Sequence, residues 1–300
     1  MLRSSKAENK MYMTKVRKAV IPVAGYGTRF LPATKAQPKE MLPIVDKPII
    51  QYVVEEAVAS GITDIIMVTG ASKRAVEDHF DYNYALEDWL KKQGKRKEGQ
   101  EIRRLAEMAN FIYIRQKGPY GNGTPVLSAR DVVGDEPFVV LWGDEFIYAT
   151  PPRVAQCLEV FERYGDPVIS GIRVDKKDVG QYGIADAVQV EKNVYQLRAL
   201  VEKPSPDKAP SNLATHGCYV LTPEIFDELA KLKPGKGGEV WLVDAIMALM
   251  RRRPVYACEI SDGVYYDTGS KLGWLRANVD FALRDKKLRT AFRAYLKSVV

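Results

Sequence analysis

Cysteine and histidine are scarce in this chain. Its 300 residues include three cysteines, Cys157, Cys218 and Cys258, and two histidines, His79 and His216. The cysteines are widely spaced and form no CxxC pair, so we expect neither a disulfide framework nor a zinc site, and we expect a reducing cytoplasm as the compartment. Neither histidine stands in a motif with a serine or a carboxylate, which argues against a histidine-based catalytic triad.

Long hydrophobic runs are absent as well. No apolar run approaches the roughly 18 residues that cross a bilayer, and the polar start of the chain lacks the apolar core of a signal peptide. We therefore expect no membrane contact and a flexible extension over residues 1–17. The net charge is +7. The basic runs at 91–97 and 251–253 carry no interleaved aromatic residues, so we expect solvated surfaces and no nucleic-acid partner.

What the sequence does contain is a repeated alternation of strand-like and helix-like segments. Apolar residues make up 46% of the chain and charged residues 28%, an ordinary globular balance. Strands are predicted at 18–23, 64–69, 110–115, 137–141, 167–173 and 255–260, and helices at 49–60, from 73, at 123–132, 153–164, 223–232, 239–252 and after 270. Period-2 alternation over 182–201 predicts added antiparallel strands. The charged stretch 81–109 is interpreted as a helical surface insertion in a single domain over 18–300, with a mostly parallel sheet flanked by helices.

A glycine-rich turn follows the first predicted strand. Gly25-Tyr26-Gly27-Thr28-Arg29 lets backbone N–H groups approach a phosphate chain or a base without interference from Cβ atoms. The third glycine of the GxGxxG dinucleotide fingerprint is missing. The turn therefore favours a nucleotide site over a dinucleotide-dependent oxidoreductase.

Two cations accompany this turn. Arg29 and Lys39 are separated by a loop that contains Pro32 and Pro38, and prolines restrict the freedom of that loop. A nucleoside triphosphate is strongly anionic, and attack on its α-phosphorus develops more charge. Fixed cations are suited to stabilise it. We interpret Arg29 and Lys39 as catalytic.

These residues resemble a known signature. Gly25-x-Gly27-Thr28-Arg29 followed by Pro38-Lys39 is similar to the motif of the sugar-1-phosphate nucleotidyltransferases, and LPATKA followed by PKEMLPIVDKPIIQYVVEE resembles their bacterial uridylyltransferase branch. The similarity runs from about residue 18 to the C-terminal helix. It implies a glycosyltransferase-A-like fold, UTP and glucose 1-phosphate as substrates, Mg²⁺ as cofactor, and a homodimer or homotetramer.

The resemblance also assigns residues to the nucleotide. Ala24, Gly25, Glu40, Gln116 and Gly121 match positions that contact the base, beside Gly27 and Thr28 of the first turn. The chain departs from the pattern at 121–125, where it reads GNGTP in place of the usual GLGHA. The departure leaves a thymidylyltransferase, or another sugar-1-phosphate nucleotidyltransferase, as the alternative.

Two aspartates follow strand-like segments. Asp144 ends the apolar segment at 137–141, and ligands of open α/β sheets bind beyond the carboxyl ends of strands. Mg²⁺ is usually held by one or two carboxylates together with substrate phosphates. The resemblance places Asp267 as the second carboxylate, so Asp144 and Asp267 are the predicted metal ligands.

The sugar side is assigned by resemblance to Gly183, Glu202 and Lys203. A carboxylate suits sugar hydroxyls and an ammonium suits a phosphate dianion. Cys218 and Trp241 replace an arginine and a glutamine that are common in the family, which leaves the identity of the sugar open. A non-catalytic sugar-nucleotide-binding regulator is expected to have lost Asp144, Lys39 or Lys203, and this chain keeps all three.

Overall fold

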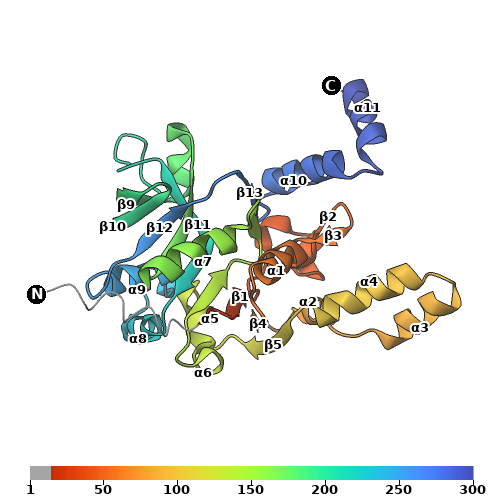
Figure 1. Ribbon diagram of the computed structural model, residues 1–300, viewed down its shortest axis with the longest axis horizontal. Coiled ribbons are helices and arrows are strands. Elements are labelled where there is room, and N and C mark those ends of the chain that lie inside the picture. Colours follow the sequence, from red (N-terminus) through yellow and green to blue (C-terminus); the bar gives the residue numbers. More distant parts are fainter. Residues whose placement is uncertain (1–14, 300) are drawn as a thin grey trace, which may run out of the picture.

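The computed structural model describes residues 15–299 and is built around one nine-stranded sheet (Figure 1). The strand order is β5-β4-β1-β6-β11-β8-β12-β10-β9. The ladders are parallel from β5 to β6 and between β8 and β12, whereas β11 and β10 run against their neighbours. The other seven of the nine strands therefore share one direction, which is the mixed α/β arrangement expected. Of the expected extension over 1–17, residues 1–14 lie outside the described part.

The strands are short and follow the predicted order. In the large sheet they are β1 (Lys18–Pro22), β4 (Asp64–Thr69), β5 (Asn110–Arg115), β6 (Phe138–Leu141), β8 (Val168–Arg173), β9 (Gly183–Glu191), β10 (Val194–Glu202), β11 (Leu213–Leu221) and β12 (Tyr256–Glu259). Two small antiparallel pairs accompany it, β2 (Pro43–Ile44) with β3 (Lys47–Pro48) and β7 (Glu145–Ala149) with β13 (Gly263–Asp267). The sequence pattern did not predict β2, β3, β7 or β11, whereas β13 is the strand expected before Asp267.

The helices lie between these strands along the chain. They are α1 (Ile49–Ala59), α2 (Arg74–His79), α3 (Tyr84–Lys92), α4 (Arg96–Glu107), α5 (Gly123–Ser128), α6 (Arg130–Val133), α7 (Arg153–Tyr164), α8 (Glu224–Lys231), α9 (Leu242–Leu249), α10 (Lys271–Arg284) and α11 (Arg289–Val299). Short 3-10 helices add η2 (Thr28–Phe30), η3 (Ala33–Lys35), η4 (Lys39–Met41), η5 (Lys176–Gln181) and η6 (Lys236–Gly238).

Three helix predictions needed correction. The helix predicted over 123–132 is two short helices, α5 and α6, and the helical region after 270 is divided into α10 and α11. At the second break the Asp285 carboxylate accepts hydrogen bonds from the amides of Lys287 and Leu288, at 2.7 and 2.8 Å. The helix predicted over 239–252 begins only at Leu242, because Glu239 and Trp241 are extended and the amide of Val240, between them, donates to the carbonyl of Tyr120 at 2.9 Å.

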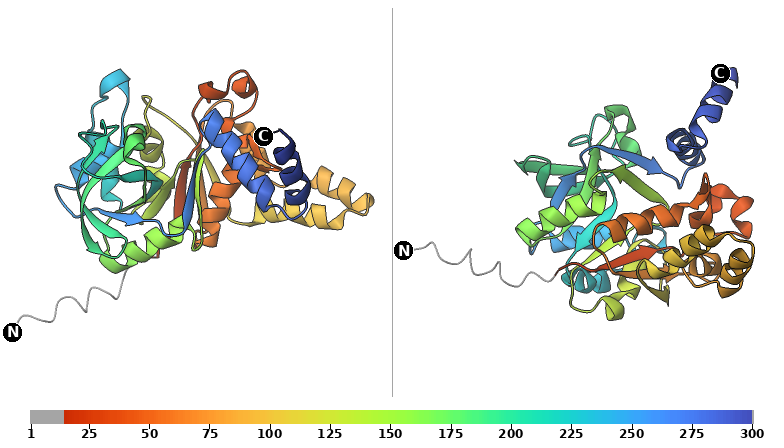
Figure 2. Two further views of the ribbon diagram at one scale, coloured as in Figure 1. Left: turned by 90° about the horizontal axis from the view of Figure 1, so that it is seen from above. Right: turned by 45° about the vertical axis from the view of Figure 1, so that its right-hand side comes forward.

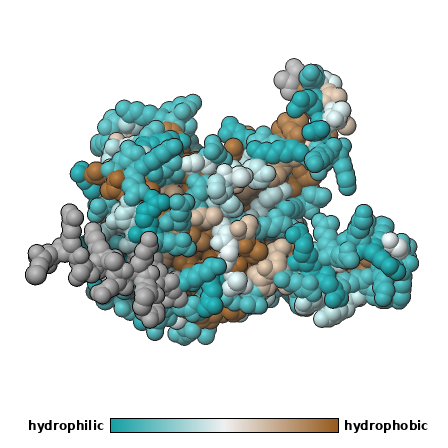
Figure 3. Space-filling view, in the orientation of Figure 1, coloured by the Kyte–Doolittle hydropathy of each residue, from teal (hydrophilic) through white to brown (hydrophobic). Residues whose placement is uncertain are grey.

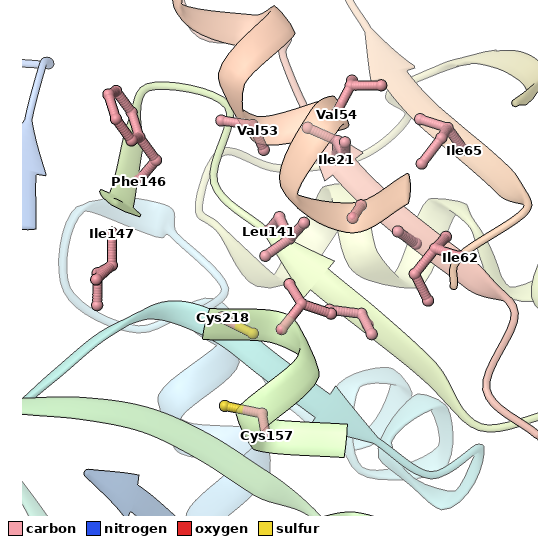
Figure 4. Close-up of a cluster of buried hydrophobic side chains, with 14 of the residues drawn as sticks. Ile21, Val53, Val54, Ile62, Ile65, Leu141, Phe146, Ile147, Cys157 and Cys218 are labelled. Atoms are coloured by element: carbon pink, nitrogen blue, oxygen red, sulfur yellow. The ribbon is translucent and has the colours of Figure 1, made fainter. Parts of the chain in front are cut away.

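The central strands are buried on both faces, which explains their nearly continuous apolar sequences. On one face, Ile21 of β1 and Leu141 of β6 pack in a cluster with Val53 and Val54 of α1 and Cys157 of α7 (Figure 4). The alternate strand residues face a second cluster with α5, α8 and α9. The sheet is thus the middle of three layers, with α1 and α7 on one side and α5, α8 and α9 on the other.

Two helical hairpins project from these layers, α3–α4 from the charged stretch 81–109 and α10–α11 at the C-terminal end (Figures 1 and 2). The surface is mostly hydrophilic, with hydrophobic residues gathered near the middle of the face shown and along the α10–α11 arm (Figure 3). Within residues 15–299 no helix has the length and apolar character needed to span a bilayer.

The fold brings together three thiols that are far apart in sequence. Cys157 on α7, Cys218 on β11 and Cys258 on β12 are all buried and free. Hydrogen bonds with the thiols of Cys218 and Cys258, together with burial, raise the pKa of the Cys157 thiol well above its usual value. These hydrogen bonds and burial therefore keep the thiol of Cys157 in its protonated form.

Candidate functional site

The predicted site residues gather at one edge of the sheet. Because β1, β4, β5 and β6 are parallel, their carboxyl ends lie at the same edge. The first glycine turn follows β1, Gln116 follows β5, and Asp144 follows β6 closely. The amide of Gln116 donates a 3.0 Å hydrogen bond to the carbonyl of Thr69 at the end of β4. The hydrogen bonding between β4 and β5 therefore continues one residue beyond β5.

The first glycine turn is folded back onto Lys39. Gly27 has a left-handed φ of 67°, and its carbonyl accepts a 2.7 Å hydrogen bond from the hydroxyl of Thr34. A Cβ atom at Gly27 would lie 3.1 Å from Cβ of Lys39, and one at Gly25 would lie 3.8 Å from its ammonium nitrogen. A side chain at Gly27 would therefore crowd Lys39, whereas a Cβ atom at Gly25 would only touch it in ordinary van der Waals contact.

Asp144, Asp267 and Arg29 converge on Gly269. A Cβ atom on Gly269 would lie 2.8 Å from Oδ2 of Asp144, 3.2 Å from Oδ1 of Asp267 and 3.5 Å from a guanidinium nitrogen of Arg29. The two-stranded pair of β7 and β13 produces this convergence, because Asp267 is opposite Glu145, the residue after Asp144. Glycine is needed at 269 because a side chain would fill the space between the carboxylates.

Lys39 makes an ion pair with Asp144. Its Nζ lies 2.5 Å from Oδ2 of Asp144, and both side chains stay about one quarter exposed, 23% and 25%. Burial opposes the charge on Lys39, but the charges of Asp144 and Glu40 outweigh it, so the pKa of Lys39 is raised. Lys39 is thus a fixed cation, open to solvent, next to the predicted metal ligand.

Glu40 faces away from this open space. Its side chain is 1% exposed and accepts a 2.8 Å hydrogen bond from Nζ of Lys73, which is 3% exposed. Burial raises the pKa of the Glu40 carboxyl, although the charges of Lys73 and Lys39 oppose this. The carboxylate predicted to contact the base is therefore engaged by Lys73, a residue that no sequence motif indicated.

The second glycine turn is held by the segment that precedes α9. Gly121 has a φ of 118°, and a Cβ atom there would lie 2.2 Å from the carbonyl oxygen of Val240. The amide of Gly123 donates to that same oxygen at 2.9 Å, and the side chain of Asn122 accepts from the amide of Leu242 at 2.8 Å. The GNGTP segment, which departs from the usual GLGHA pattern, therefore forms a turn that the side chain of Asn122 anchors to the backbone of Leu242.

The predicted sugar residues form a separate group beside β11. A Cβ atom on Gly183 would lie 3.3 Å from Oε2 of Glu202 and 3.1 Å from the hydroxyl of Thr215. Lys203 has a φ of 47°, a conformation that costs energy for a residue with a side chain. Its Nζ lies 3.6 Å from Oε1 of Glu202, and both side chains are exposed. The strained backbone turns two charged groups toward open space.

β11 joins this group to Asp144. Its Thr215 pairs with Gly183, and two residues further along, the carbonyl of Gly217 accepts a 3.1 Å hydrogen bond from the amide of Trp142. Trp142 lies two residues before Asp144. The register of β11 therefore sets the separation between the predicted sugar residues and the predicted metal ligands.

A buried polar cluster lies behind the carboxylates. Glu145 accepts a 2.8 Å hydrogen bond from the hydroxyl of Tyr265, and one of its oxygens lies 3.8 Å from the guanidinium of fully buried Arg153. Burial raises the pKa of Glu145 to about 7, against the effect of Arg153. The ring of His216 is 3.9 Å from that of Tyr265. Sequence analysis gave no role to Arg153, which lies in no recognisable motif, or to Tyr265, although Tyr265 lies two residues before Asp267.

The donor set at Gly269 fits one kind of metal. Among residues 15–299 no group of three or more histidine, cysteine, aspartate or glutamate side chains could hold an ion. Asp144 and Asp267 offer two carboxylates around one small space. Mg²⁺ commonly binds to one or two carboxylates and takes its other ligands from water and substrate phosphates. The residues present therefore fit Mg²⁺ that is completed by substrate.

Comparisons with known proteins point to the same chemistry. The nucleotidyl transferase family matches residues 18–283. A UTP–glucose-1-phosphate uridylyltransferase of Bacillus subtilis, YngB, is 48% identical over 286 residues, 95% of this chain and 96% of that protein. The structure of a UTP-bound UGPase from Acinetobacter baumannii has a TM-score of 0.88 at 38% identity, covering 95% of this chain and 100% of that one. A UDP-glucose pyrophosphorylase complexed with UDP-glucose has a TM-score of 0.82 at 38% identity, with 90% and 100% covered.

Proposed function

Because the chain belongs to the nucleotidyl transferase family, we propose that it joins UTP to α-D-glucose 1-phosphate and releases pyrophosphate. The observation that carries the proposal is the separation of its cations around a pair of carboxylates. Arg29 and Lys39 lie next to Asp144, and Lys203 lies next to Glu202 in the separate group beside β11. Two anionic substrates need cations on both sides to approach each other.

The reaction needs no nucleophile from the protein. An oxygen of the sugar phosphate attacks the α-phosphorus of UTP, a new P–O bond forms, and the bond to the leaving pyrophosphate breaks in line. Lys203 holds the attacking phosphate while Glu202 and Gly183 hold the sugar. Arg29 and Lys39 stabilise the charge on the triphosphate and the departing pyrophosphate. In this scheme Lys39 exchanges its carboxylate partner, Asp144, for phosphate oxygens.

The nucleoside lies between the two glycine turns in this proposal. Ala24, Gly25, Gly27 and Thr28 contribute the first turn, and Gln116 and Gly121 contribute the second. Glu40 acts indirectly, since its carboxylate is held by Lys73. Asp144 and Asp267 would hold Mg²⁺, which would supply positive charge to offset the negative charge of the substrate phosphates.

A substrate panel tests the proposal. UTP, dTTP, CTP, ATP and GTP are each supplied with glucose 1-phosphate and with other sugar 1-phosphates, and pyrophosphate release is measured. We expect UTP with glucose 1-phosphate to give the highest kcat/KM. A preference for dTTP would favour a thymidylyltransferase, and binding without turnover of any pair would favour a regulator. Normal turnover of Lys203→Ala at saturating substrates would contradict the role given to Lys203.

We further propose that one nucleotidyltransferase domain over 18–300 assembles into a homodimer or homotetramer in the cytoplasm. α11 has no residue buried within the chain, and Leu272, Leu275 and Tyr295 of the α10–α11 arm are 60%, 52% and 59% exposed. A second copy that covers these apolar side chains would remove them from water. Free buried thiols suit a reducing compartment. Light scattering on the native chain and on Tyr295→Lys tests the assembly, which the substitution is expected to weaken.

A further inference from the structure

Two exposed tyrosines connect the glycine turns. The hydroxyl of Tyr26, in the first turn, lies 3.0 Å from that of Tyr120, at the start of the second. Their ring centroids are 6.2 Å apart, with the planes tilted by 49°. Both side chains are largely in solvent, 70% and 62% exposed, so packing does not explain their contact.

Each turn is anchored independently of this contact. The first is held by Thr34, which donates to the carbonyl of Gly27, and the second by the backbone of Val240. Within residues 15–299, the bond between the phenols is the hydrogen bond that links residues 24–30 to residues 116–123. The bond between Tyr26 and Tyr120 is therefore not what holds either turn in its own conformation. What it fixes is the distance between the turns.

The position of the pair is informative. Tyr26 directly follows Gly25, and Tyr120 directly precedes Gly121, and these two glycines are assigned to opposite sides of the nucleoside. We propose that Tyr26 and Tyr120 form a clasp that positions the two turns around the nucleotide and slows its release, an assignment that rests on the nucleotide site of the proposed function. They are positioning residues, and the reacting atoms remain those already described.

An exposed bond between two phenols is weak enough to open and close during each cycle. A neutral hydrogen bond contributes modestly in net terms, because water replaces either partner when it breaks. Nucleotide can then enter while the phenols are apart, and the bond re-forms across it. Loss of one hydroxyl is expected to shorten the residence of the nucleotide without changing the cations that act on the phosphates.

A double-mutant cycle tests the clasp. Tyr26→Phe and Tyr120→Phe are each expected to raise the KM for UTP about threefold to tenfold, with kcat changed by less than about twofold and KM for glucose 1-phosphate unchanged. The double variant should be no worse than either single one, because the same bond is lost in all three. Tyr84→Phe, on the exposed α3, is the matched control and should leave every constant unchanged.

Direct binding keeps the test separate from the proposed reaction. Calorimetric titration of UTP and the other triphosphates measures affinity even if glucose 1-phosphate proves to be the wrong sugar. We expect Kd for the preferred nucleotide to rise in both single variants by the same factor as in the double variant. Independent, additive effects, a lower Kd, or an unchanged Kd in both single variants would overturn the clasp. Failure of the substrate panel with intact nucleotide coupling would overturn only the proposed sugar.

Discussion

Lys39 and Glu40 are neighbours in sequence, yet they belong to ion pairs of different character. Lys39 pairs with Asp144 where both side chains remain about one quarter exposed, and Glu40 pairs with Lys73 where both are almost completely buried. The two N···O distances, 2.5 and 2.8 Å, do not distinguish the pairs. Burial distinguishes the two pairs. A cation that remains exposed to solvent can exchange its carboxylate partner for a substrate phosphate, whereas a buried ion pair cannot be separated without a large electrostatic cost.

This difference in burial is what we expect if the Lys39–Asp144 pair acts in the proposed catalysis and the Glu40–Lys73 pair stabilises the fold. η4, a single turn of 3-10 helix over Lys39–Met41, turns the two side chains in different directions. Glu40 points to Lys73, just before α2, and Lys39 points to the loop after β6. The buried pair thereby fixes the backbone from which the open lysine extends.

Breaking the buried pair should have the largest effect on stability. In Lys73→Met the Glu40 carboxylate keeps its burial and loses its partner, so we expect the free energy of unfolding to fall by about 3–5 kcal/mol. Urea denaturation measures this change. The double variant Lys73→Met/Glu40→Gln, which removes the stranded charge, should regain part of the loss. A decrease below about 1 kcal/mol in Lys73→Met would show that burial does not distinguish the two pairs.

Breaking the open pair should affect turnover instead. Lys39→Met is expected to lower kcat roughly a hundredfold, about 3 kcal/mol of transition-state stabilisation, because one cation next to the phosphates is lost. Its free energy of unfolding should change by less than about 1 kcal/mol, since the pair is partly solvated. Steady-state kinetics and urea denaturation on the same preparation separate the two effects. A large loss of stability with kcat preserved would reverse the assignment.

His216 is buried without an opposite charge beside it, so it extends the comparison from paired to unpaired buried groups. Burial, helped by the charge of Arg153, lowers the pKa of His216 to about 3. In the unfolded chain a histidine has a pKa of about 6.5, so the unfolded state takes up the proton first as pH falls. The stabilising contribution is thus complete above about pH 6.5 and is lost progressively toward pH 3.

The expected size of this effect is measurable. Between pH 7 and pH 5.5 the wild-type protein should lose about 1 kcal/mol more stability than His216→Gln, because only the wild type carries this histidine. Comparing the two proteins cancels the other groups that titrate in the same range, among them Glu145, whose raised pKa acts in the opposite direction. Parallel stability curves for the two proteins would contradict the prediction.

A fully solvated pair supplies the smallest expected effect. Lys92 and Asp88 on α3 form an ion pair at 2.5 Å, with side chains 72% and 58% exposed. Lys92→Ala should change the free energy of unfolding by no more than about 0.5 kcal/mol. Thermal unfolding of this variant beside Lys73→Met therefore compares ion pairs of 2.5 and 2.8 Å at opposite extremes of burial.

Much of the fold could be read from the chain. The alternation of apolar segments predicted β1, β4, β5, β6 and β8 in order, and all of these except the edge strand β5 have the continuous apolar sequences of buried strands. The same pattern missed β7 and β11, although the strand expected before Asp267 is present as β13. It also extended the helix at 239–252 too far, because Val240 donates a hydrogen bond to the carbonyl of Tyr120 and accepts one from the amide of Gly123, and both partners are distant in sequence.

The candidate site was likewise predictable from the sequence only in part. The sequence by itself determined which chemical groups are present at this edge of the sheet. The glycine turn, Arg29, Lys39 and Asp144 all stand in motifs that can be recognised without the structure. Only the tertiary structure decided that Gly269 joins Asp144 to Asp267, that Glu40 faces Lys73, and that Tyr26 meets Tyr120. Local motifs specify which groups are present. Strand register, burial and contacts between distant loops specify what those groups face, and that depends on the whole fold.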